Sequence, residues 1–186
     1  QHSLWGSQRL GWVLSCYAMS MNPARSSTAT GVQDSGWYRD RIGSVDIALV
    51  HGTMTESSFE HFLDEACRSI DECPDDARIA MFLEVTEPAL MDGRWRKRMA
   101  ESLKVRADKL ARTRPAYAMV TSSLVVRSAL RVMHWAAPPP YPHTVVGSAR
   151  EAFDFIARHV PGLDAREIHL DYEQRKAQVI AQRRRD

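Results

Sequence analysis

Residues 78–86 read RIAMFLEVT, a nearly continuous apolar run with the length of a β-strand. Such a run is typical of a strand that is covered on both faces, as strands of parallel sheets are. Two further segments have the same character, residues 45–50 (VDIALV) and residues 116–122 (AYAMVTS). Shorter strands are predicted at residues 38–42, which would form a hairpin with the first of these two segments, and at residues 144–146.

Helical segments separate the predicted strands. The first has apolar side chains spaced three and four residues apart, the pattern of one buried helix face: Phe59, Phe62, Leu63, Ala66, Cys67 and Ile70. Ser57 and Glu60 fit a capping box at its start. Further helices are predicted at about 94–113, at 124–135 and after Ser148. This alternation predicts an α/β fold, with a four- or five-stranded, mostly parallel sheet and helices packed against it.

The chain divides into three parts. We predict a disordered leader at residues 1–36, an α/β domain at residues 37–160, and a polar C-terminal helix or tail at residues 161–186. An apolar run at residues 10–18 makes a signal peptide the alternative interpretation of the leader. This run is shorter than the roughly 18 residues of a membrane helix, so we expect no transmembrane segment.

Several classes of site are disfavoured by the residue pattern. The nine glycines stand far apart, so that neither G-x-G-x-x-G nor G-K-[ST] occurs, and G-x-S-x-G is also missing. No two of the seven histidines are spaced as H-x-x-x-H, and three cysteines are too few for a disulfide scaffold. We therefore predict no cofactor and no metal site, and we interpret Cys67 as a core thiol with a Cys67–Cys73 redox pair as the alternative.

The net charge of +2 conceals two opposed blocks. Residues 51–90 hold two basic and ten acidic side chains, and residues 91–186 hold nineteen basic and ten acidic ones. Within the second block, residues 92–114 contain nine basic residues against three acids. Charge asymmetry of this kind favours an interaction surface.

Residues 138–142 (PPPYP) are interpreted as a rigid connector with polyproline II geometry.

We predict a partner-binding surface at the start of the basic segment and on the loop before it. The candidate residues are Asp92, Gly93, Arg94, Arg96, Lys97 and Lys104. We expect the partner to be a protein with an acidic surface. A second copy of this chain is one alternative, because the predicted helix at residues 56–72 is itself acidic, and an anionic lipid headgroup is another. The segment lacks the interleaved aromatics and motifs that specific nucleic-acid recognition would need.

Two other functions are open alternatives. An apolar-ligand or lipid-binding domain would require an enclosed apolar pocket. An enzyme would use His51, which follows a predicted strand, as its acid–base residue. That activity would require a cleft joining His51 to a carboxylate such as Glu84.

The order of elements resembles a STAS domain, in particular the SpoIIAA-like bacterial proteins of the STAS/SEC14 kind. The resemblance covers about residues 37–160 and rests on four segments: VDIALVHGTMT (45–55), RIAMFLEV (78–85), AYAMVTSSLVVRSAL (116–130) and VVGSAREAFDFIARH (145–159). The last is similar to the final short strand and helix of that family. Membership would imply a non-enzymatic, cytoplasmic, regulatory or protein-interaction module.

The family's switching members carry a phosphorylated serine within D-S-S-G, at the start of the helix after the central strand. The matching place here is residues 91–94, Met-Asp-Gly-Arg, which keeps the aspartate and lacks the serine. The resemblance therefore implies a module without the usual serine phosphoswitch. Thr86 and Ser122 are the nearest hydroxyl groups at predicted strand ends.

Overall fold

A computed structural model describes residues 32–34, 36–52, 54–86, 93–136 and 139–183. They contain one six-stranded sheet in which the strands follow one another in chain order: β1 (Val32–Asp34), β2 (Trp37–Ile42), β3 (Val45–Val50), β4 (Ala80–Val85), β5 (Tyr117–Thr121) and β6 (His143–Val146). The first three strands are antiparallel, and β3 to β6 are parallel. Gly43 makes the tight β2–β3 turn with a positive φ of 55°.

The predicted α/β class and the mostly parallel sheet are confirmed. Strands β2 to β6 are the five predicted strands, and the three-residue β1 adds a sixth at the edge. β1 lies within residues 1–36, which the sequence predicts to be a disordered leader; residues 1–31 lie outside the described residues. The STAS-like character of the fold stays a prediction.

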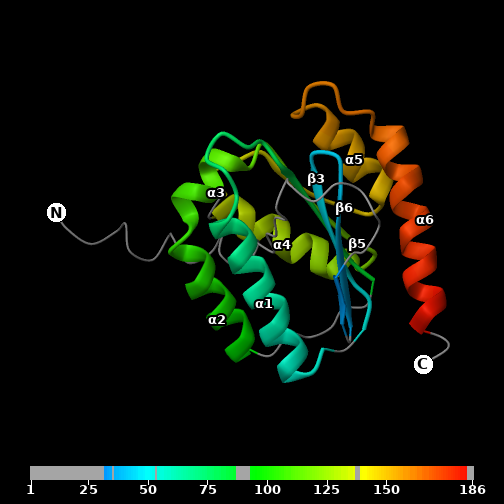
Figure 1. Cartoon of the computed structure of the whole chain (residues 1–186). Coiled ribbons are helices and arrows are strands. Elements are labelled where there is room, and N and C mark those ends of the chain that lie inside the picture. The colour runs from blue at the N-terminus through cyan, green and yellow to red at the C-terminus, as the bar shows by residue number, and fades with distance from the viewer. Residues whose placement is uncertain (1–31, 35, 53, 87–92, 137–138, 184–186) are drawn as a thin grey trace.

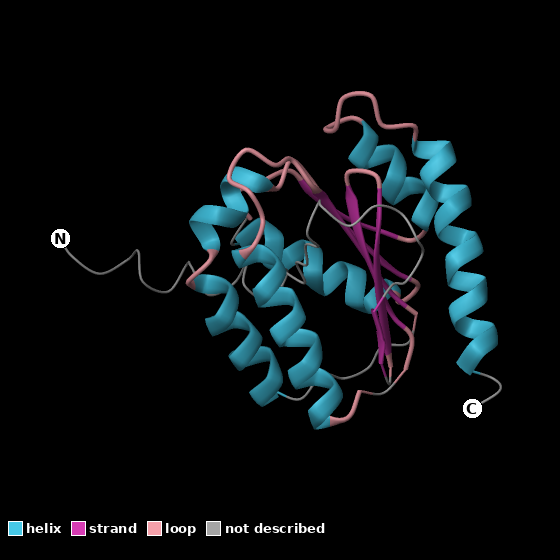
Figure 2. Cartoon of the chain, in the orientation of Figure 1, coloured by secondary structure: helices cyan, strands magenta, loops and turns pink. Residues whose placement is uncertain are grey.

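The strand order determines which face of the sheet the helices cover. Connections between neighbouring parallel strands are right-handed, so a sheet that grows in one direction receives all its crossover helices on the same face. Figures 1 and 2 show these helices together on one side of the sheet: α1 (Glu56–Asp71), α2 (Gly93–Lys104), α3 (Ala107–Thr113) and α4 (Leu124–Ala136). We call this side the crossover face.

The opposite side, here called the C-terminal face, is covered by α5 (Ala149–Ala157) and α6 (Ala165–Arg183) (Figure 1). The sequence predicts residues 161–186 as a polar helix or tail beyond a domain that ends at residue 160. In the structure α6 packs on the sheet, with Ile168, Tyr172 and Val179 buried. Because every crossover helix lies on the other side, α5 and α6 are the helices that cover the apolar side chains of this face within the described residues.

Each face has its own apolar core. On the crossover face, Phe59 and Phe62 of α1 pack with Trp37 of β2 and with residues of α2 and α3. On the C-terminal face, the rings of Phe82 and Phe153 stack with centroids 4.5 Å apart. Successive residues of a strand point to opposite faces, so β3 and β4 contribute to both cores.

Helix ends differ from the prediction at two places. The side chain of Thr55, two residues before the predicted Ser57, accepts from the backbone N–H of Ser58, one of the free N–H groups in the first turn of α1. The segment predicted as one helix at 94–113 is two helices, α2 and α3, separated at Val105 and Arg106. The predicted Ser148 cap is confirmed, because its hydroxyl accepts from the backbone of Glu151. Within the described residues, no helix has the length and hydropathy needed to span a membrane.

Candidate functional site

The predicted partner-binding residues lie at the beginning and on the outer side of α2. Gly93 opens the helix, and Arg94 and Lys104 are exposed. The side chain of Lys97 is 79% exposed and lies 4.0 Å from Glu101, one turn along the same helix. Of the two other candidates, Arg96 belongs to the α2 backbone, and its side chain lies outside the described residues together with all of Asp92.

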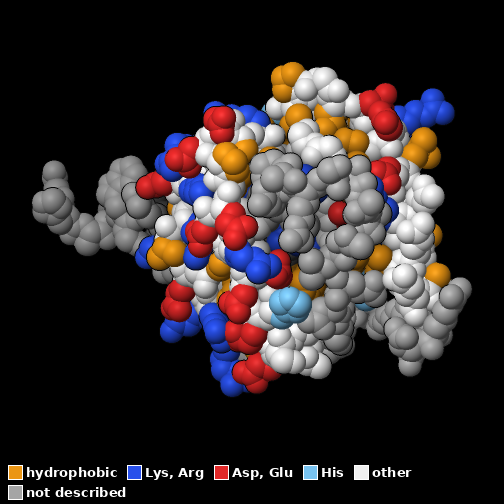
Figure 3. All heavy atoms as spheres, viewed as in Figure 1, with side chains coloured by type: hydrophobic (Ala, Val, Ile, Leu, Met, Phe, Trp, Pro, Cys, Tyr) orange, Lys and Arg blue, Asp and Glu red, His pale blue; other side chains and the backbone are white. Residues whose placement is uncertain are grey.

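The inner side of the basic segment faces the acidic helix α1 and pairs with it. Side chains of this segment contact α1 and the loop after it: Arg98 pairs with Glu60, Arg106 with Asp71 and Arg112 with Asp75, and the Lys109 ammonium donates to the backbone carbonyl of Asp71. The hydrogen bond from Arg106 to Asp71 raises the pKa of that arginine. Figure 3 shows acidic and basic side chains interleaved over this side of the molecule. Part of the opposed charge is therefore paired within the chain.

This pairing divides the basic residues into two groups. Arg94, Lys97 and Lys104 are spaced by three and seven residues and share the face of α2 that points away from the buried Met99 and Leu103. We call these three residues the outer α2 stripe. All three residues of the stripe are exposed, and Lys97 pairs with Glu101 on the same helix, whereas Arg98, Arg106 and Arg112 pair with α1 or with the residues that follow it.

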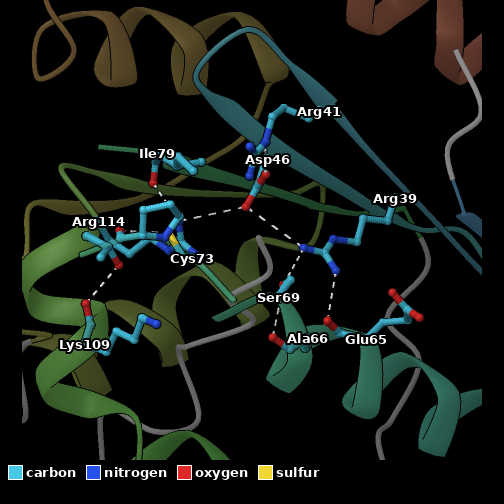
Figure 4. Close-up of polar contacts among 12 residues, drawn as sticks. Arg39, Arg41, Asp46, Glu65, Ala66, Ser69, Cys73, Ile79, Lys109 and Arg114 are labelled. Carbon is cyan, nitrogen blue, oxygen red and sulfur yellow. Dashed lines mark hydrogen bonds and ion pairs between the residues drawn. The ribbon is translucent and has the colours of Figure 1, made fainter. Parts of the chain in front are cut away.

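A buried charge cluster lies between the sheet and α1 on the crossover face (Figure 4). Asp46 of β3 is placed between Arg39 of β2 and Arg114 at the end of α3, with N–O distances of 4.0 and 3.9 Å. The side chains of both arginines are fully buried, and that of Asp46 is 1% exposed. Arg41 also donates to Asp46, at 2.8 Å. Burial lowers the pKa of Arg39 to about 10.

The two buried arginines also donate to backbone carbonyls and to a hydroxyl. Arg39 donates to the hydroxyl of Ser69 at 2.8 Å and to the carbonyl of Glu65 at 3.2 Å, both on α1. Arg114 donates to the carbonyl of Ile79 at 3.3 Å. The cluster thereby joins β2, β3, α1 and the segment before β5. Sequence patterns give no signal for it, because its members come from distant positions in the chain.

A second polar cluster, on the C-terminal face, holds α6 to the sheet. Glu84 accepts from the Tyr172 hydroxyl at 2.5 Å and from the Lys176 ammonium at 2.6 Å. Burial, together with the carboxylate of Glu84, raises the pKa of Tyr172 well above its usual value. Nearby, Asp40 accepts from the hydroxyl of Tyr38 at 2.8 Å and pairs with Arg175.

His51 lies just beyond β3 and is 4% exposed, and its backbone N–H donates to Gly36. The carboxylate of Glu84, the predicted companion of His51, is held by Tyr172 and Lys176 as described above. Two surface hollows, of about 330 and 410 Å³, open in the described part of the molecule, and neither is lined by His51 or Glu84. Of the two hydroxyls at strand ends, Thr86 donates to the carbonyl of Val50, and Ser122 is exposed.

The thiols and possible metal ligands are dispersed. Cys67 and Cys73 are both free, and burial raises the pKa of Cys67, which disfavours the reactive thiolate. Among the described residues, no three His, Cys, Asp or Glu side chains form a group that could hold a metal ion.

A scan against protein-family models and searches of curated proteins and solved structures found no match to this chain. The resemblance to STAS domains therefore continues to rest on the sequence segments alone.

Proposed function

We propose that this chain is a non-enzymatic regulatory or protein-interaction module of the STAS/SpoIIAA-like type, which binds an acidic protein partner through the outer α2 stripe. The observation that carries the proposal is the division of the basic segment. Its inner arginines pair with α1 or the residues just after it, whereas the three basic residues of the outer α2 stripe are exposed, and Glu101, which contacts Lys97, is one acidic residue beside these three basic ones. Such a surface attracts partners of opposite charge and orients them during encounter.

Exposed apolar side chains support a protein as the partner. Leu124 and Val125 begin α4, directly after β5, and are 66% and 79% exposed. Val105, which follows α2, is 80% exposed. Protein interfaces combine apolar contacts with a charged rim, whereas binding to nucleic acid is dominated by phosphate contacts.

The polar clusters support an interaction module over an enzyme. Asp46 and Glu84, two of the buried carboxylates described above, contact arginine, lysine and tyrosine side chains that bind them to neighbouring elements. These contacts join a strand to a helix or to a second strand. This arrangement gives both carboxylates a structural role that connects the sheet to the elements packed on it.

Charge reversal of the outer α2 stripe tests the proposal. The full chain is expressed in its native cells as wild type and as Lys97→Glu/Lys104→Glu, and cross-linked partners are identified by quantitative mass spectrometry. Arg150→Glu/Arg166→Glu is the matched control, since it changes the net charge equally at exposed sites on α5 and α6. We expect one set of acidic partners to be retained by the control and lost from the stripe variant.

Equal recovery of partners by the two double variants would contradict the assigned surface. A parallel measurement with vesicles that contain anionic lipid examines the lipid alternative. Stripe-dependent binding to vesicles, with no stripe-dependent protein partner, would replace the proposed protein partner with a membrane surface.

A further inference from the structure

A surface hollow of about 330 Å³ opens at the amino ends of β4, β5 and β6. Three arginines line it, Arg78, Arg112 and Arg114, and a wall of ring side chains is formed by Pro115 and residues 140–142 (Pro-Tyr-Pro). Ligands of parallel sheets usually bind at the opposite, carboxyl edge. This hollow is therefore separate from the loops of that edge.

The two outer arginines of the hollow are arranged around its mouth. Arg78 and Arg112 are both exposed, and Arg78 donates to the backbone carbonyl of Arg112 at 2.5 Å. The guanidinium of Arg112 lies 3.6 Å from the carboxylate of Asp75, which also lines the hollow and is itself 71% exposed. An ion pair this exposed is weak, so a ligand with two anionic oxygens can compete for the guanidinium of Arg112.

The third arginine connects the hollow to the buried cluster in Figure 4. Arg114 and Arg39 are fully buried and share the carboxylate of Asp46, so two cations face one anion in an environment of low dielectric. Within the described residues, Nε and Nη2 of Arg114 have no hydrogen-bond partner. Positive potential from an incompletely neutralised buried cation reaches further than that of a solvated one.

We propose that this hollow binds a small organic oxyanion, a phosphate monoester or a carboxylate that carries a flat apolar group. Arg78 and Arg112 contact the anionic oxygens, Arg114 adds positive potential from behind, and the apolar group packs against Tyr141 and its neighbouring prolines. The volume is at the lower end of the range for small-molecule sites. The proline segment is thus a wall of the site as well as a rigid connector between α4 and β6.

The test is a titration of the full chain at constant ionic strength, followed by amide NMR shifts. The probes are phenyl phosphate, benzoate and inorganic phosphate, which separate the contribution of the anionic group from that of the ring. We expect saturable shifts of the amides of residues 112–114, Tyr141 and His143, with phenyl phosphate or benzoate binding more tightly than inorganic phosphate. Arg112→Gln and Arg78→Gln should each weaken binding about tenfold, as expected for the loss of one charge-assisted hydrogen bond.

Arg98→Gln is the matched control for Arg112→Gln. The two side chains are 56% and 55% exposed, and each pairs with one acidic residue of the acidic block, Glu60 or Asp75. Arg98→Gln should therefore keep the wild-type affinity while losing a comparable ion pair. Equal weakening by both variants, or an absence of saturable shifts in the wild type, would overturn the proposal. Because the outer α2 stripe is intact in all these variants, the result is independent of the proposed protein partner.

Discussion

The two faces of the sheet bury charged groups in different ways. On the crossover face, Arg39, Asp46 and Arg114 have side chains that are at most 1% exposed, and positive charge exceeds negative charge. On the C-terminal face, Glu84 and Lys176 are 11% and 21% exposed and pair one to one. The carboxylate of the first cluster is therefore more deeply buried than that of the second, which pairs with a partly exposed lysine.

The difference follows from the order of the chain. α1 is a crossover helix between two adjacent strands, so it covers the first cluster and supplies two hydrogen-bond acceptors to it. α6 is the last helix, and it holds the second cluster with residues spaced one turn apart, Tyr172 and Lys176. We infer that the crossover cluster contributes more to global stability, whereas the C-terminal cluster determines where α6 docks.

The largest expected effect comes from Asp46→Asn, which leaves Arg39 and Arg114 buried without a counter-charge. Breaking a buried pair in this way destabilises by about 3–5 kcal/mol. Urea unfolding of the variant and the wild type measures the loss. Asp40→Asn is the comparison on the C-terminal face; since Asp40 and Arg175 are 11% and 21% exposed, we expect a smaller loss, of about 1–2 kcal/mol. Equal losses of unfolding free energy in the two variants would show that the deeper burial of Asp46 does not make its cluster more important for stability.

The contrast between the faces also shows what sequence patterns predict. Strand and crossover positions follow from local periodicity, as with residues 78–86 and Ser148. The docking of α6 is harder to predict because only a few apolar side chains, such as Ile168, Tyr172 and Val179, mark its buried side among many polar ones. The break between α2 and α3 at Val105 and Arg106 is not predictable in this way, because neither residue is a glycine or a proline.

The candidate sites are likewise not predictable from local sequence patterns alone. The opposed charge blocks were visible in the sequence, but their contact with each other depends on α2 and α3 packing beside α1. The hollow at the amino edge combines residues from three separate connections, at 75–78, 111–115 and 140–142. Such a combination exists only after the sheet has formed, so no local pattern predicts it.

Acid should weaken the crossover face through His134 of α4. Burial, with a contribution from His143, lowers the pKa of His134 from 6.5 to about 4. The unfolded chain therefore binds a proton that the folded chain excludes, and stability present above pH 6.5 is lost as the pH falls towards 4. We expect a loss of about 2–3 kcal/mol from this residue. Urea unfolding across this pH interval measures it, and His134→Phe should flatten the dependence.

Alkali should weaken the C-terminal face through Tyr172. Its folded-state pKa is raised, mainly by burial, above the usual value of 10, so stability is present below pH 10 and is lost as the pH rises beyond it. Tyr172→Phe removes this ionisation and should reduce the alkaline loss without altering the acid response. An acid response that survives in His134→Phe, or an alkaline response unchanged in Tyr172→Phe, would assign the pH dependence to other groups.

The smallest expected effect concerns the surface contact between the two charge blocks. Arg98 and Glu60 form an ion pair between α2 and α1, with side chains 56% and 28% exposed. A double-mutant cycle with Arg98→Gln and Glu60→Gln should give a coupling of about 0.2–1 kcal/mol that declines with added salt. A coupling as large as the Asp46→Asn loss would mean that α2 is held chiefly by charge. A small coupling means that Met99 and Leu103 hold α2 in place, and that the opposed charges mainly leave the outer α2 stripe as the exposed positive surface of this helix.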